Sequence, residues 1–179
     1  MMKKIEVFDY AKEILEGVKN GVLVTTKTNE KVNTMSISWG SLGIEWNKPI
    51  FITFVRENRF TKNQLEEHGE FTVNIPIGDF DKKIIGYAGT KSGFDVDKVK
   101  ELGLTLVDGV CVDVPSIKEL PLTLECKVIY KQMQDSDEIT EENKKAHYPQ
   151  DVDSSHYAAN MDYHIAYYGE IVNAYIIEK

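Results

Sequence analysis

The chain has 179 residues, of which 42% are hydrophobic and 28% are charged, as in an ordinary soluble protein. A chain of this length buries about 70% of the surface of its extended form, so we expect one domain over residues 1–179 that needs no metal or disulfide to fold. The formal net charge of −8 argues against a general nucleic-acid binder, because neutralising a phosphate backbone requires a clustered positive surface.

The first half of the chain predicts two helices and four strands. Helices are predicted where apolar residues recur at helical spacing, at residues 9–19 and 61–68. Strands are predicted where short runs are apolar or alternate with polar residues, at residues 22–26, 32–39, 50–55 and 70–76. The polar turn at residues 27–31 joins the first two strands into a hairpin.

The second half predicts short helices and long strands. Helices are expected at residues 79–87 and 96–102, separated by a loop at residues 89–93. Asp108-Gly109, a dipeptide typical of two-residue turns, predicts a hairpin between residues 104–107 and 110–114. Long strands follow at residues 120–133 and 163–177, and Gly169 within the second predicts a bulge or a close backbone approach.

The segment between these two long strands, residues 134–160, is polar. A helix is expected near residues 138–146, and we expect the segment to be mobile or to pack on a partner. Seven or more strands, mostly antiparallel with helices inserted between them, predict a mainly β fold. The expected architecture is a β-barrel with inserted helices.

One helix start suggests an anion site. Residues 61–64 have the form of a capping box, which predicts Thr61 as the N-cap residue. The first turn of a helix has unpaired N–H groups and partial positive charge, so phosphate binds there readily. Arg56, Asn58 and Arg59 lie immediately upstream and can close around the same anion. The same residues also fit a capped surface helix with two solvated arginines, and both interpretations stay open.

The segment from Asn33 to Trp39 has two different faces if it forms a strand. Small hydroxyl side chains share one face, namely Thr34, Ser36 and Ser38. The other face carries Asn33, Met35, Ile37 and Trp39. Small polar side chains let the edge of a flat ligand reach backbone groups, and a tryptophan can wall one side of such a site. The alternative is an amphipathic barrel strand whose hydroxyl groups are in water.

Other reactive residues show no catalytic or metal-binding spacing. The four histidines do not pair as zinc ligands, so no metal site is expected. Cys111 and Cys126 lie in apolar stretches, where buried, unreactive thiols are expected. No phosphate-binding glycine loop of the Walker or dinucleotide type occurs, so any redox chemistry must come from a bound cofactor.

No apolar run approaches the ~20 residues of a membrane span, and no apolar signal-peptide core follows the first lysines. We therefore expect a cytoplasmic protein that does not insert into a membrane.

Several motifs together resemble the flavin reductase-like family, and more narrowly its flavoredoxin-type branch. They are Asn33-Thr-Met-Ser-Ile-Ser-Trp39, Gly40-x-x-Gly43-x-x-Trp46-x-x-Pro49 and Val55-Arg-Glu-Asn-Arg-Phe-Thr61. The resemblance extends through Glu70-Phe-Thr-Val-Asn-Ile75, Gly89-Thr-Lys-Ser-Gly-Phe-Asp95, Leu124-Glu-Cys126 and His164-x-x-x-x-Gly169-Glu170-Ile171. It covers nearly the whole chain.

The resemblance implies an FMN-binding split β-barrel of Greek-key antiparallel topology, usually a homodimer with flavin sites at or near the subunit interface. It places the isoalloxazine edge on the residues from Asn33 to Trp39. It places the phosphate at Arg56, Asn58, Arg59 and the helix start at Thr61. The sequence departs from the common Arg-Pro-Ser-Arg form of the phosphate loop, because Glu57 and Asn58 stand between the two arginines.

Two further parts of the expected site also come from the resemblance. The family's glycine-rich loop corresponds to Gly89, Thr90, Lys91 and Ser92, and the charge of Lys91 would favour the anionic reduced flavin. His164 corresponds to a position near the flavin face in related NAD(P)H:flavin reductases, and it is the catalytic candidate.

These expectations lead to two main hypotheses. The first is an FMN-dependent oxidoreductase that takes hydride from NADH or NADPH, or electrons from a protein donor, and passes them to free flavin or a redox partner. The second is a non-enzymatic FMN-containing electron carrier that a partner protein reduces. A third, weaker possibility is a structural barrel that has lost its cofactor.

Overall fold

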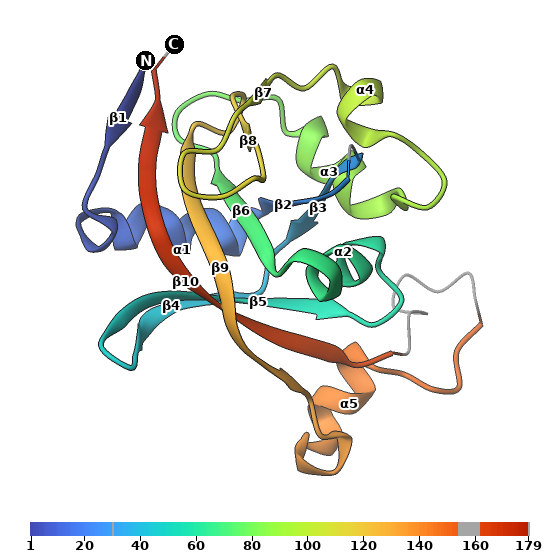
Figure 1. Ribbon diagram of the computed structural model, residues 1–179. Helices are drawn as coiled ribbons and strands as arrows, with labels where there is room; N and C mark the ends of the chain where they lie inside the picture. Colours follow the sequence, from blue (N-terminus) through green and yellow to red (C-terminus); the bar gives the residue numbers. More distant parts are fainter. Residues whose placement is uncertain (30, 154–161, 179) are drawn as a thin grey trace.

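The structure is a computed structural model that describes residues 1–29, 31–153 and 162–178. Its main feature is an eight-stranded antiparallel sheet (Figure 1), in which seven strands follow the order β3-β2-β6-β9-β10-β5-β4 and β1 pairs with β10. These strands are β1 (Met2–Lys4), β2 (Val22–Thr28), β3 (Lys31–Ile37), β4 (Gly40–Glu45), β5 (Lys48–Arg56), β6 (Glu70–Ile75), β9 (Leu122–Met133) and β10 (His164–Ile177).

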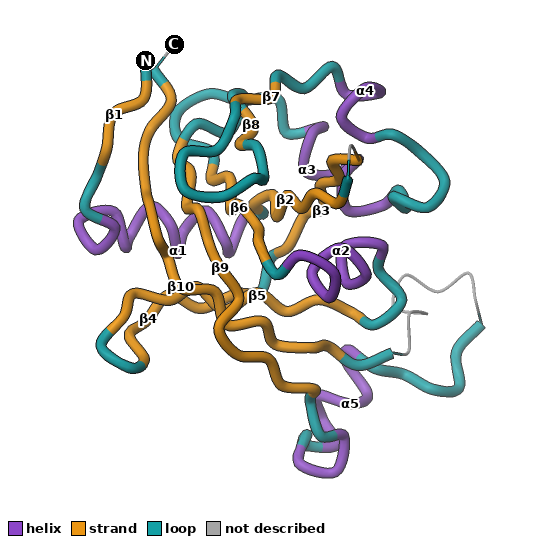
Figure 2. Tube along the Cα trace, in the orientation of Figure 1, coloured by secondary structure: helices purple, strands orange, loops and turns teal. Residues whose placement is uncertain are grey.

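Helices lie between the strands along the chain, as Figure 2 shows. They are η1 (Val7–Tyr10), α1 (Ala11–Asn20), α2 (Phe60–His68), α3 (Lys83–Thr90), α4 (Lys98–Leu102), η2 (Ser136–Glu138) and α5 (Glu141–His147). A small second sheet pairs β7 (Leu106–Val107) with β8 (Ser116–Ile117). The mainly β, antiparallel class with inserted helices is therefore confirmed. Closure into a barrel is not seen, because no strand pairing among the described residues joins β3 to β4.

The core forms where α1 covers the sheet. Ile14 and Val18 of α1 are buried in the main apolar cluster, which also includes Phe51, Phe71 and residues of β6, β9 and β10. The helix lies very close to β6, since a Cβ built on Gly17 would be 2.5 Å from Cγ2 of Ile75. A smaller apolar cluster includes Ile84 of α3 and Leu23 of β2, which points to the opposite face of the strand from Val22 and Val24 in the main cluster.

A row of buried polar side chains links four neighbouring strands. The Thr25 hydroxyl lies 3.1 Å from both Thr34 Oγ1 and Asn74 Oδ1, and the Asn74 amide donates to Thr123 Oγ1 at 3.2 Å. These bonds connect β3, β2, β6 and β9 across the sheet. Because buried hydroxyl and amide groups are costly to leave unpaired, the row favours one register of these strands over a shifted one.

The long strand β10 confirms the prediction made from Gly169. The pairing with β9 shifts register between Tyr168 and Gly169, as a β-bulge requires. The backbone also passes close to Phe71, whose ring atoms would lie 2.5 and 2.7 Å from a Cβ at this glycine. A larger residue cannot occupy this position without moving Phe71.

The hairpin predicted around Asp108-Gly109 is wrong. β7 pairs with β8 of residues Ser116–Ile117, and residues 108–115 form a loop. The buried carboxylate of Glu125 accepts the backbone N–H groups of Val110 and Cys111 at 2.6 and 2.8 Å. This contact with a distant strand overrides the local turn preference.

Several smaller expectations also need correction. Strands β1 and β4 were not predicted, because β1 is only three residues long and the glycines of β4 weaken its strand pattern. Cys126 is buried as expected, but Cys111 is exposed in the loop that Glu125 holds. Of the polar segment 134–160, residues 154–160 lie outside the described residues, so the expectation of mobility or partner contact is not tested there. No helix among the described residues is long and apolar enough to cross a membrane.

Candidate functional site

A cavity of about 220 Å³ lies where the end of β3 meets the ends of β5 and β10. β5 and β10 pair so that Arg56 stands directly opposite His164, which brings together two residues far apart in the sequence. The cavity is lined by Met35, Ser36, Ile37, Ser38, Trp39, Phe54, Arg56, Arg59 and His164. All of these except Phe54 belong to the site expected from the sequence.

Helix α2 is tied to β3 by buried hydrogen bonds. The Asn33 amide donates to Thr61 Oγ1 at 2.9 Å, and the Gln64 amide donates to the Lys31 carbonyl at 2.8 Å. Thr61 is only 1% exposed, and the helix begins at Phe60 with Arg59 at the N-cap position and no side-chain cap. The predicted capping box is therefore wrong, because the Thr61 hydroxyl is turned inward to fix the helix on β3.

A carboxylate from a distant part of the chain, that of Asp162, lies at the predicted phosphate loop. Arg56 donates from Nη1 to the Asp162 carbonyl at 2.8 Å and from Nη2 to the His147 carbonyl at 2.9 Å. Asp162 Oδ2 accepts the backbone N–H of Asn58 at 2.9 Å, and Oδ1 lies 3.8 Å from Arg56 Nη1. Glu57 is exposed, whereas the Asp162 carboxylate lies at the loop itself.

Arg59 lies against the last turn of α3. Its guanidinium donates to the Gly89 carbonyl at 3.4 Å. A Cβ on Gly89 would collide with Ser36 Oγ unless that side chain turned away, so the end of α3 lies close to β3. Burial, and then the neighbouring Arg56, lower the pKa of Arg59. Two cations thus lie side by side in a partly desolvated place, where an anion would be stabilised.

The remaining predicted residues lie outside the cavity. Thr34 is buried in the polar row beneath the sheet surface, and Asn58, Thr90 and Lys91 are exposed. Helix α3 extends to Thr90, so the predicted loop 89–93 begins as the last turn of a helix, and Ser92 follows it in a half-buried turn. Lys91 occupies the C-cap position of α3.

A different lysine, Lys98 of α4, is the buried cation of this region. It is 4% exposed, and its ammonium group donates to the Thr34 carbonyl at 2.8 Å and to the Ala88 carbonyl at 3.0 Å. Burial and the nearby Arg59 lower the pKa of Lys98 to about 8. Sequence analysis missed it because a lysine in a short charged helix is ordinarily at the surface.

His164 is nearly buried and touches aromatic groups from two other segments. Its Nδ1 lies 2.7 Å from the Tyr148 hydroxyl, and its ring centroid lies 5.1 Å from that of Trp39. Trp39 also contacts His147, with centroids 5.0 Å apart. Burial, and then Arg56, lower the pKa of His164 to about 4, so the imidazole is neutral at pH 7. No periodicity marked Tyr148, because it lies in the polar segment after α5.

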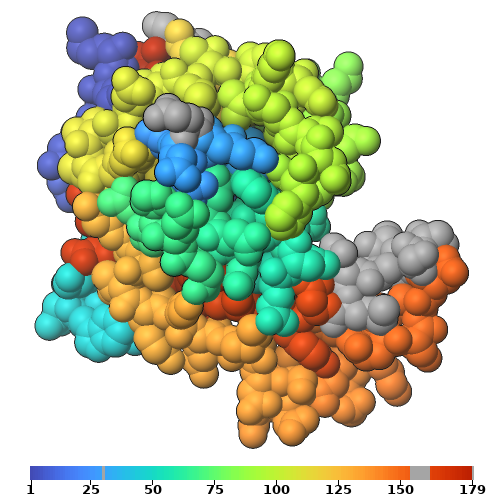
Figure 3. Space-filling view, turned by 45° about the vertical axis from the view of Figure 1, so that its right-hand side comes forward, coloured from blue at the N-terminus to red at the C-terminus, as the bar shows by residue number. Residues whose placement is uncertain are grey.

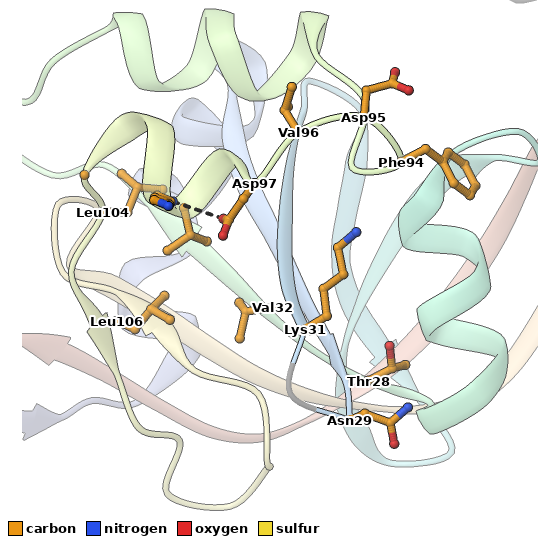
Figure 4. A pocket seen from close by; sticks show the side chains of 13 residues that line it. Thr28, Asn29, Lys31, Val32, Phe94, Asp95, Val96, Asp97, Leu104 and Leu106 are labelled. Carbon is orange, nitrogen blue, oxygen red and sulfur yellow. Dashed lines mark hydrogen bonds between the residues drawn. The ribbon is translucent and has the colours of Figure 1, made fainter.

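A larger cavity, of about 1040 Å³, lies elsewhere and contains none of the predicted site residues. It is bounded by β3, the turn before it and the segment leading into α4 (Figure 4). Lys31 and Lys100 lie here with Asp95 and Asp97, and Asp97 is engaged in capping α4. Figure 3 shows residues of the β2–β3 hairpin, in blue, between the yellow and green segments of the chain. Within the described part of the chain, no three potential metal ligands gather into a cluster.

Comparison with known proteins gives consistent matches. A family model described as "Flavin reductase like domain" matches residues 18–179. The structure is similar to flavoredoxin of Desulfovibrio vulgaris (Miyazaki F), with 26% identity and a TM-score of 0.65 over 88% of this chain and 69% of that one. Flavoredoxin from Methanosarcina acetivorans matches with 26% identity and a TM-score of 0.65, over 88% of this chain and 68% of that one.

A curated relative matches over a shorter stretch. An uncharacterized protein of Archaeoglobus fulgidus is 36% identical over 100 residues, which are 56% of this chain and 55% of that protein. The match therefore spans little more than half the length of that relative.

Proposed function

Because the chain belongs to the flavin reductase-like domain family, we propose that it binds FMN non-covalently at the cavity beside β3 and transfers electrons through it. The observation that carries this proposal is the partly buried pair of Arg56 and Arg59 at a cavity walled by Trp39. When bound, the flavin supplies the redox chemistry, while the protein supplies binding, orientation and electrostatics.

Arg56, Arg59 and the start of α2 would hold the phosphate. A helix N-terminus favours an anion through its unpaired N–H groups and its dipole, and the arginines add charge-assisted hydrogen bonds. Asp162 would compete with the phosphate, because its carboxylate already binds the Asn58 N–H near Arg56. The flavin edge would lie on Ser36, Ser38 and Trp39, near the end of β3 where the strand ladder stops at Ile37.

A second cavity supports a reductase that takes hydride from NADH or NADPH. It has a volume of about 430 Å³, shares Trp39 with the first cavity and extends to α5. Space for another small molecule therefore adjoins the proposed flavin site. In this reductase, His164 is the catalytic candidate, since it lines the flavin cavity as a neutral imidazole.

A homodimer is part of the same proposal. The cavity of about 220 Å³ is smaller than the ~300 Å³ at the lower end of ordinary ligand sites. A cofactor as large as FMN would therefore extend beyond it, and a second copy of the chain would complete the site. The closed split barrel with Greek-key topology, formed as one domain over residues 1–179, also belongs to the proposal.

An electron carrier without its own reductase activity is the alternative. It is favoured by the similarity to two structures named flavoredoxin at 26% identity. In that case a partner protein, and not a nicotinamide, would reduce the bound flavin.

An absorption spectrum of the purified protein, before and after FMN is added, tests the proposal. Bound flavin is expected to show bands near about 370 and 450 nm, shifted from those of free FMN. NADH or NADPH is then added without oxygen. Bleaching supports the reductase, whereas bound flavin that stays oxidised supports the carrier. A protein that binds no FMN would overturn both.

A further inference from the structure

The amide of Gln134 has a defined orientation. Its Oε1 lies 3.1 Å from the backbone nitrogen of His164. A backbone N–H is always a donor, so the side-chain atom facing it must be the oxygen and not the NH₂ group. The orientation of the Gln134 amide therefore follows from the His164 backbone N–H, which can only donate a hydrogen bond.

The same oxygen determines what the Tyr148 hydroxyl does. The hydroxyl lies 2.8 Å from Gln134 Oε1, which can only accept, so Tyr148 donates its single proton there. The hydroxyl oxygen also lies 2.7 Å from Nδ1 of His164. With its proton already used, Tyr148 can only accept from His164.

We propose that Gln134 and Tyr148 are positioning residues that hold His164 in its Nδ1–H tautomer, so that Nε2 is a bare acceptor for a molecule in the cavity. His164 lines that cavity, and no hydrogen bond from a described residue reaches Nε2. A bound molecule must then offer an N–H or O–H group to this nitrogen. In a reaction His164 can accept a proton but has none to give from Nε2.

The surroundings keep the ring neutral, as the tautomer argument requires. Three groups oppose a charge on His164: Arg56 from β5, Arg59 from the loop before α2, and His147 from α5. Asp162, two residues earlier in the chain, has its carboxylate engaged with the Asn58 N–H and close to Arg56. Burial acts in the same direction as the cations, so the imidazole remains uncharged at neutral pH.

The position of the Tyr148 ring is itself constrained. The ring is 5% exposed and stacks on Tyr163 with centroids 4.9 Å apart. The Arg56 guanidinium lies over it at 5.1 Å. The hydroxyl is therefore presented to His164 by a ring with little freedom to turn away.

Nitrogen NMR of the full-length protein labelled with ¹⁵N-histidine tests the proposal directly. Spectra are recorded at pH 7 before and after FMN is added, and His164→Gln identifies the His164 signals. The expected pattern shows a proton-bearing Nδ1 and a bare Nε2. A proton on Nε2 in the wild-type protein would overturn the proposal. The cofactor-free spectrum makes this result independent of FMN binding, on which the functional meaning of the tautomer rests.

Variants separate positioning from general stability. Tyr148→Phe is expected to shift the tautomer ratio by about tenfold toward Nε2–H, since one neutral hydrogen bond is lost. Gln134→Glu keeps an acceptor at the same place and is expected to preserve the tautomer, whereas Gln134→Leu is not. Tyr130→Phe, at an exposed tyrosine of β9, is the matched control. An unchanged ratio in folded Tyr148→Phe would show that Tyr148 does not position His164.

Discussion

Two cavities are lined in part by residues of β3, and they differ in the charge and burial of their side chains as well as in volume. The larger, of about 1040 Å³, has exposed charges of both signs, such as Lys100 and Asp95. The smaller, of about 220 Å³, has half-buried Arg56 and Arg59 and the nearly buried His164. The pKa values of Arg59 and His164 are lowered there. Ionisable groups with strongly perturbed pKa values gather at functional sites. The charge and burial of its residues therefore identify the small cavity as the candidate functional site, although its volume is the smaller of the two.

The largest expected effect is on cofactor affinity. Arg59→Ala should weaken FMN binding about 50-fold, because it removes charge-assisted hydrogen bonds to the phosphate. Titration of the protein with FMN, followed by flavin fluorescence, measures this change. The matched control is Lys100→Ala in the larger cavity, which should leave the dissociation constant unchanged. Equal losses in both variants would contradict the assignment of FMN to the small cavity.

The next effect concerns Lys98, the buried cation that contacts the backbone of β3. Lys98→Met should lower the free energy of unfolding by about 2 kcal/mol at pH 7, because two carbonyl groups lose their donor. The pKa of Lys98 falls from 10.5 to about 8 on folding, so the unfolded chain binds more protons between these values. The stability of the wild type relative to the variant should therefore rise from pH 8 to pH 10.5. Urea unfolding of both proteins across this pH range measures the difference in their stability. A difference that stays constant with pH would contradict the prediction.

Lowering the pH should destabilise the protein through His164, the neutral histidine of the small cavity. The pKa of His164 falls from 6.5 to about 4 on folding, so the unfolded chain binds the additional proton in this window. Its contribution to stability is complete above pH 6.5 and is lost as the pH falls toward 4. Relative to His164→Gln, the wild type should lose stability over this range in urea unfolding. His68→Gln, at the exposed end of α2, is the control and should follow the wild type.

The smallest expected effect comes from the Asp162 carboxylate beside the predicted phosphate loop. Asp162→Asn keeps an oxygen for the Asn58 N–H but removes a negative charge near Arg56. FMN should bind about threefold more tightly, and the gain should shrink as salt is added. Calorimetric titration at two salt concentrations measures both. Asp95→Asn, in the larger cavity, should change neither the affinity for FMN nor its dependence on salt. Weaker binding by the Asp162 variant would indicate that the carboxylate supports the site.

Local patterns predicted most elements because their causes are local. The alternating residues around Met35 became β3, and the glycine within the last strand marked a real bulge. Predictions failed where a distant group decided the outcome. Glu125 took the backbone groups that the Asp108-Gly109 hairpin would have used. Asn33 turned the Thr61 hydroxyl away from its expected capping role.

The amino-acid sequence alone determined the antiparallel β class and the segments that carry the candidate site, since side-chain alternation and the residues at positions 33–61 are local properties. Only the tertiary structure decided which charges meet. Strand pairing sets His164 opposite Arg56, and packing buries Lys98 against the β3 backbone. Asp162 comes to lie beside Arg56 for the same reason. Desolvation and proximity depend on chain segments more than 100 residues apart, as in the Arg56–Asp162 contact at a separation of 106, so no local pattern records them.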